Sequence, residues 1–227
     1  MVSNNEKITP HSLGGLYGTQ TPGITLRKLN LTPAVTLHDQ GVFLKQGYAR
    51  SRHYDESKGS FLPVLEIAVH SENLIDVFVT LTNKLAEELK EEEEYSSVSE
   101  YLTLIFESSH LTQEGHEDWL AIITDPIVLE SQIYQFEDLL LKDGKTGISV
   151  CSFSTKNEVH LSEDKIIYVF GKDLEGFESL LEENGIERDD KMYFLNEHAH
   201  SNNSKPDYHA KFLELVQDAD AEKVVES

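Results

Sequence analysis

The stretch from Trp119 to Asn196 decides the fold, and it reads WLAIITDPIVLESQIYQFEDLLLKDGKTGISVCSFSTKNEVHLSEDKIIYVFGKDLEGFESLLEENGIERDDKMYFLN. Short apolar runs alternate in this stretch with segments whose apolar residues recur every three or four positions. The first pattern is typical of buried strands, and the second is typical of helices that pack one face on a sheet. The stretch therefore predicts a β, α, β succession that occurs twice.

The first predicted unit begins with a strand at Leu120 to Thr124, which Asp125-Pro126 ends because proline cannot continue a strand ladder. A helix follows and ends near Asp143-Gly144, and its apolar stripe consists of Leu129, Ile133, Phe136 and Leu140. The next strand is expected at Ile148 to Phe153. These three elements form one βαβ unit.

The second predicted unit has its first strand at Lys165 to Phe170. Asp173 can cap a helix that Gly185 ends, and Met192 to Leu195 is the expected last strand. With a meander around Asn157 to Ser162 between the units, we predict an α+β fold, a ferredoxin-like βαβ-βαβ sandwich over about residues 119–196.

A further βαβ unit precedes this sandwich. Its strands are expected at Leu62 to Val69 and at Glu100 to Glu107, and the helix between them carries the apolar stripe Leu74, Phe78, Leu81, Leu85 and Leu89. The ferredoxin-like pairing could therefore also begin at residue 62. We prefer residues 119–196 because their elements are joined by shorter connections, which favour neighbours in a sheet.

The chain divides by composition into four segments. Residues 1–60 form a glycine-rich, mildly basic and irregular arm with a hairpin, whose strands are expected at Val35 to Leu37 and Val42 to Leu44. Residues 61–117 hold the preceding βαβ unit with its acidic helix, and residues 118–196 hold the ferredoxin-like domain. Residues 197–227 contain a histidine-bearing loop, a helix expected at Pro206 to Val216, and an acidic tail.

Composition excludes several classes of protein. The chain of 227 residues is long enough to bury a core without disulfides, and Cys151 is its only cysteine. No apolar stretch resembles a signal peptide or a membrane span, so we expect a soluble, cytoplasmic protein that does not bind membranes. There is no serine nucleophile elbow, no paired CxxC and no GxGxxG after a strand, which argues against the common hydrolase and dinucleotide-binding classes.

Charge is distributed unevenly. The formal net charge is −22, yet residues 1–60 hold seven Lys or Arg against four Asp or Glu, whereas residues 61–227 hold twelve against thirty-seven. Such a body repels the phosphates of nucleic acids, so direct nucleic-acid binding is not expected. The function predicted from charge is a non-enzymatic protein-interaction or regulatory module that binds a basic partner, and an open sheet also favours a homo-oligomer.

The alternative function is a metal-dependent hydrolase. Glu197, His198 and His200 follow the predicted last strand, and His209 lies on the predicted C-terminal helix. If the strand continues, His198 and His200 project to one face, where zinc or another divalent metal could bind with His209 as third ligand and Glu197 beside it. A metal-bound water at an open position would then drive hydrolysis.

A second cluster could contact a ligand. Arg50, Arg52, His53 and Tyr54 bring positive charge and aromatic rings together, which suits a phosphate or a nucleotide base. The more common role of such arginines is to pair with the acidic remainder of their own chain or of a twin subunit. A sensor that binds a small ligand between the sheet and the arm is the remaining alternative.

Overall fold

Eight strands form one antiparallel sheet in the computed structural model, which describes residues 27–55, 59–93, 101–111, 116–123, 125–152 and 154–224. The strands follow the order β10-β5-β4-β6-β7-β8-β3-β2 across the sheet. Their bounds are β2 Gly47–Asp55, β3 Ser60–Ala68, β4 Leu102–Ser108, β5 Glu117–Ile123, β6 Thr146–Ser152, β7 Asn157–Leu161, β8 Ile167–Phe170 and β10 Glu222–Lys223. The fold is thus α+β with an antiparallel sheet.

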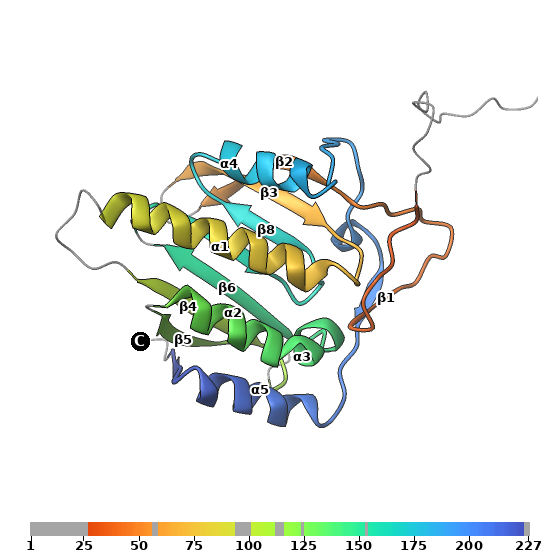
Figure 1. Ribbon diagram of the computed structural model, residues 1–227. Coiled ribbons are helices and arrows are strands. Elements are labelled where there is room, and N and C mark those ends of the chain that lie inside the picture. Colours follow the sequence, from red (N-terminus) through yellow and green to blue (C-terminus); the bar gives the residue numbers. More distant parts are fainter. Residues whose placement is uncertain are drawn as a thin grey trace, which may run out of the picture.

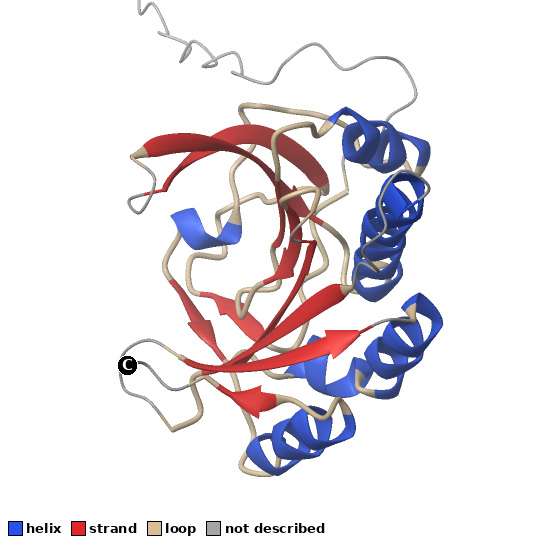
Figure 2. Ribbon diagram, turned by 90° about the vertical axis from the view of Figure 1, so that its left-hand side faces the viewer, coloured by secondary structure: helices blue, strands red, loops and turns tan. Residues whose placement is uncertain are grey.

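The α-helices of the described residues lie on one face of this sheet, as Figure 2 shows. In Figure 1 the longest of them, α1, runs across the middle of the sheet, with α4 near one edge and α5 near the other. Their bounds are α1 Leu74–Glu93, α2 Pro126–Gln135, α3 Glu137–Lys142, α4 Glu175–Glu183 and α5 Tyr208–Asp218. This arrangement leaves the opposite face of the sheet for other elements.

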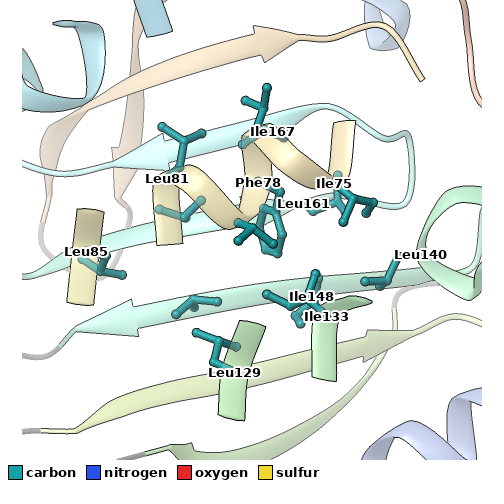
Figure 3. Packing of buried hydrophobic residues seen from close by; sticks show 14 of the residues in the cluster. Ile75, Phe78, Leu81, Leu85, Leu129, Ile133, Leu140, Ile148, Leu161 and Ile167 are labelled. Atoms are coloured by element: carbon teal, nitrogen blue, oxygen red, sulfur yellow. The ribbon is translucent and has the colours of Figure 1, made fainter. Parts of the chain in front are cut away.

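The main core lies between the sheet and the helices. Phe78 and Leu81 of α1 pack toward Leu161 of β7 and Ile167 of β8 (Figure 3), and all four side chains are buried. Each of these strands alternates, so that one set of side chains enters the core and the other set faces away from it. The three-to-four spacing predicted for α1 is what turns its apolar stripe onto the sheet.

A second, smaller core covers part of the other face. Here β1 (Val35–Leu37) pairs in antiparallel fashion with β9 (His200–Asn202), and the 3-10 helix η1 (Leu195–Glu197) precedes β9 along the chain. Ala34, Leu195 and Phe194 pack there against Ala68 of β3 and Ile166 beside β8. Residues 34–44 and 192–195, far apart in the sequence, thus belong to the same small core.

The ferredoxin-like arrangement is not confirmed. Met192 to Leu195, predicted as its last strand, is no strand, because these apolar residues enter the second core before the turn of η1. The strands of the preceding βαβ unit, β3 and β4, belong to the same sheet as β5 to β8. Both alternative starting points of the predicted sandwich therefore fall within one larger sheet.

Two local predictions also differ from the structure. Val35 to Leu37 pairs with β9 and not with Val42 to Leu44, which forms no strand, so the predicted hairpin is wrong. The helix expected to run to Asp143 is divided at Phe136, where α2 ends and α3 begins. Among the described residues, no helix is both long and apolar enough to cross a bilayer.

Candidate functional site

Strand β2 forms one edge of the sheet and carries an unusual amount of positive charge. Its sequence GYARSRHYD pairs with β3 so that Arg50 lies opposite Leu65 and Arg52 lies opposite Pro63. Leu65 is fully buried in the core between sheet and helices. Because side chains alternate along a strand, Arg50 and Arg52 emerge on that same helix-bearing face, beside α4.

The two arginines meet a third one from a distant part of the sequence. Arg188, in the segment after α4, forms a parallel bridge with Tyr48 at the start of β2. All three arginines line an open pocket of about 290 Å³, together with Ser51 and Pro63. A pocket lined by three arginines contrasts with a chain whose net charge is −22.

Carboxylates of the chain hold two of these arginines. Glu178 of α4 accepts from both, with Oε2 at 3.2 Å from Nη1 of Arg50 and Oε1 at 3.1 Å from Nη1 of Arg188. Asp190 binds Arg188 through two parallel bonds, Nε to Oδ1 and Nη2 to Oδ2, both 2.9 Å long. Such bidentate pairs fix the plane of a guanidinium group.

These contacts shift the pKa values of Arg188 and Asp190 in the directions that favour their charged forms. The hydrogen bond with Asp190 raises the pKa of Arg188, and the bonds from Arg188 and from the backbone amide of Arg50 hold the pKa of Asp190 below its usual range. Nearby, burial and the bond from its hydroxyl to Glu182 raise the pKa of Tyr48 to about 12. All these groups keep their ordinary charge at neutral pH.

Arg52 differs from its two neighbours. It is exposed and lines the pocket, yet within the described residues it has no ion pair or hydrogen bond with a side chain. A guanidinium group presents five N–H donors in a planar fork that suits carboxylate and phosphate. The pocket can therefore bind an anionic group through Arg52, with further donors of Arg50 and Arg188 around it.

Only part of the predicted ligand cluster comes together. Arg50 and Arg52 line the pocket, but His53 points to the opposite face, where its ring centroid lies 5.9 Å from that of Phe170. The ring of Tyr54 packs against Phe61 at 5.1 Å. Sequence reasoning missed Arg188, since nothing in the local pattern after Gly185 indicates that this segment returns to β2.

The predicted metal ligands have separate partners. His200 is held on both nitrogens, with Nε2 at 3.0 Å from Oδ1 of Asp164 and Nδ1 at 2.8 Å from the carbonyl oxygen of His198. The ring of His209 stacks on His110 at 5.2 Å. Glu197 accepts a bond from the backbone amide of Phe194, as in a capping box.

The described part of the chain holds no group of three or more His, Cys, Asp or Glu side chains arranged for a metal ion. Burial disfavours the imidazolium of His200, but its bonds to the His198 carbonyl and to Asp164 raise its pKa above the usual value. A protonated imidazole cannot bind a metal, so this shift acts against the predicted role. The metal site stays a prediction.

The side chains of Ser108, His110 and Asp143 also contact one another in a row inside the molecule. Ser108 Oγ lies 2.9 Å from Nδ1 of His110, whose Nε2 lies 3.1 Å from Oδ2 of Asp143. Ser108 is 3% exposed and Asp143 is fully buried, so a substrate has no access to this hydroxyl. These buried contacts join the end of β4 to the end of α3.

No protein-family model, no curated protein and no solved structure matches this chain.

Proposed function

We propose that the protein is a non-enzymatic protein-interaction module whose arginine pocket binds the carboxylates of an acidic partner segment. The observation that carries this proposal is Arg52, which lines an open pocket and, within the described residues, is paired with no carboxylate. Arg50 and Arg188 are held beside it by Glu178 and Asp190, so the donors are already oriented before a ligand arrives. Orientation in advance lowers the entropy cost of binding.

The test is binding of a fluorescent hexaglutamate peptide to the full chain. Arg52→Ala should weaken binding by about tenfold or more, which corresponds to about 1.4 kcal/mol or more. The matched control is Lys205→Ala, which removes the same charge from an exposed position before α5. Equal affinities for wild type, Arg52→Ala and Lys205→Ala would contradict the proposal, because hexaglutamate would then be bound without the pocket.

A second candidate keeps the basic partner that the overall charge predicts. Helix α4 supports it, because its sequence EGFESLLEE holds four glutamates and no lysine or arginine. Glu178 is already paired with Arg50 and Arg188 and Glu182 accepts from Tyr48, so Glu175 and Glu183 add the charge that a basic partner would meet. A hexalysine peptide separates the two candidates. Binding to the helical face should weaken when Glu175 and Glu183 are both replaced by glutamine, whereas Arg52→Ala should leave it unchanged.

Two other interpretations stay predictions. A metal-dependent hydrolase would need His198, His200 and His209 to converge, and their present partners give it no support. A small-ligand sensor would bind between the sheet and the arm of residues 1–60, of which residues 1–26 and 56–58 lie outside the described residues. Homo-oligomers and a cytoplasmic location likewise remain untested.

A further inference from the structure

We infer that the acidic partner segment binds as an added strand along the outer edge of β2, next to Arg52 and Tyr54. This inference rests on the proposed function and specifies its binding mode. It joins two features of the same strand, namely backbone groups that have no partner within the described residues and arginines beside them.

The direction of the backbone groups of β2 follows from the bonds at its first half. The amide of Tyr48 donates to the carbonyl of Glu187 at 3.1 Å, and the carbonyl of Tyr48 accepts from the amide of Asp189 at 2.8 Å. Tyr48 thus directs both groups away from β3. In an antiparallel pair this direction alternates by residue, so Arg50, Arg52 and Tyr54 also direct their amides and carbonyls outward.

The first half of this edge, at Tyr48 and Arg50, already binds another segment of the same chain. We infer that the partner binds the second half, at Arg52 and Tyr54, in the same way. Residues 187–189 lie along the first half and form one isolated parallel bridge, between Tyr48 and Arg188. A carboxylate follows, because Oδ1 of Asp190 accepts from the backbone amide of Arg50 at 3.0 Å. The edge therefore binds both a backbone and an acidic side chain of the protein itself.

The second half is open. β2 is the last strand of the sheet, and within the described residues the amides and carbonyls of Arg52 and Tyr54 have no hydrogen-bond partner. An unpaired edge of this kind is a template for another extended chain. Arg52 stands at the centre of this open half and also lines the pocket, so one incoming segment would meet both features.

Charge decides which segment fits. A second copy of this chain that pairs β2 with β2 would bring arginines close to arginines, and like charges opposite each other destabilise a strand pair. An acidic segment instead places every second side chain on the face of Arg50 and Arg52, because side chains alternate along it as well. A partner segment with alternating glutamates meets both the edge and the pocket.

The experiment uses a hexapeptide of alternating glutamate and valine and the full chain. Two derivatives carry N-methyl groups on one or the other alternate set of amides, which removes donors without changing charge. We expect one derivative to bind about tenfold more weakly than the parent peptide and the other to bind about as tightly, since only one set of amides faces β2.

Amide exchange of the protein is the second measurement. Binding of the parent peptide should slow exchange of the Arg52 and Tyr54 amides by about tenfold or more, whereas the His53 amide, which faces β3, serves as internal control.

The outcomes separate the two proposals. If both N-methylated peptides bind as tightly as the parent while Arg52→Ala still weakens all three, strand addition is overturned and the proposed function stands. If Arg52→Ala changes the affinity for neither hexaglutamate nor the alternating peptide, the arginine pocket is not the binding site and the proposed function is overturned. The arginines would then only protect the edge from aggregation. Unchanged exchange of the Arg52 and Tyr54 amides in a saturated complex also overturns strand addition.

Discussion

Lys165 carries the most strongly buried amine that the described residues contain. Its side chain lies in the turn between β7 and β8, only 6% of the residue is exposed, and Nζ donates to the carbonyl of Thr146 at 2.8 Å. Burial lowers its pKa to about 8, although Asp143, Glu163 and Asp164 lie close enough to favour the charged form. Asp143 is itself stabilised as a carboxylate, because bonds from His110, Ser204 and Thr146 outweigh burial and hold its pKa below the usual range.

The shift of Lys165 predicts how stability depends on pH. Below about pH 8 the amine is protonated in both states, so the folded protein bears the full cost of the buried charge. Between pH 8 and its ordinary pKa of 10.5, the unfolded chain binds more protons, so the free energy of unfolding rises with pH. We expect this free energy, taken relative to that of Lys165→Met, to rise by about 2 to 3 kcal/mol across this range.

Urea unfolding of both proteins at about pH 7 and about pH 10 measures this difference. Lys205→Met, which removes an exposed amine, should show no such change relative to wild type. A difference that stays constant or falls as the pH rises would show that burial does not dominate the ionisation of Lys165.

At the scale of elements, helix α2 begins with a defined cap. The Asp125 side chain accepts from the backbone amide of Ile127 at 2.9 Å, and Pro126 occupies the first turn, where no amide donor is needed. Asp125→Ala removes this acceptor and should lower the free energy of unfolding by about 1 kcal/mol. Ser131→Ala, at an exposed position within the same helix, should change stability by less than about 0.5 kcal/mol and in the stabilising direction, because alanine favours helices.

Urea unfolding again provides the measurement. Equal effects of Asp125→Ala and Ser131→Ala would mean that the cap contributes nothing beyond helix propensity.

Elements with a strong apolar period could be predicted from the sequence. The stripe of α1 and the apolar runs of β4, β6 and β8 were recognised near their observed positions, since their side chains enter one core. β2 was missed because an edge strand with one polar face carries arginines where a buried strand would carry valine or isoleucine. The strand predicted at Met192 to Leu195 is wrong for the opposite reason, since its apolar residues pack in the second core but do not belong to the sheet.

Only part of the candidate site could be predicted from the sequence. Arg50 and Arg52 are recognisable as positive charge beside aromatic rings in an acidic chain. Arg188 becomes part of the pocket through its bridge to Tyr48, and such pairing between distant segments leaves no local pattern. The opposite orientation of His53 follows from strand alternation, which could be used only if β2 had been identified as a strand.

At the scale of the whole molecule, the arginine pocket is a small positive region on a strongly negative body. An acidic ligand must therefore approach against long-range repulsion before short-range attraction takes effect. Added salt shortens the range of both the repulsion and the attraction, from about 30 Å at 0.01 M to about 8 Å at 0.15 M ionic strength. The repulsion acts over the longer distance, so salt weakens it first.

The association rate constant of hexaglutamate should therefore rise between about 0.01 M and 0.15 M NaCl, although most charged complexes form more slowly as salt is added. Stopped-flow fluorescence measures this rate, and the dissociation rate should increase over the same range. Lys205→Ala should show the same trend, because the repulsion comes from the whole body. A rate that falls with salt would mean that the ligand meets a locally positive field at long range.

The order of strands has a consequence for the newly made chain. β3 and β4 follow one another along the polypeptide with only α1 between them, yet β6, β7 and β8 separate them in the sheet. A nascent chain that has reached residue 125 can form the β2–β3 and β4–β5 hairpins, but the strands that lie between them in the sheet are not yet made. Folding of the sheet during synthesis on the ribosome must therefore wait for residues 146–170, because β6, β7 and β8 connect the two hairpins.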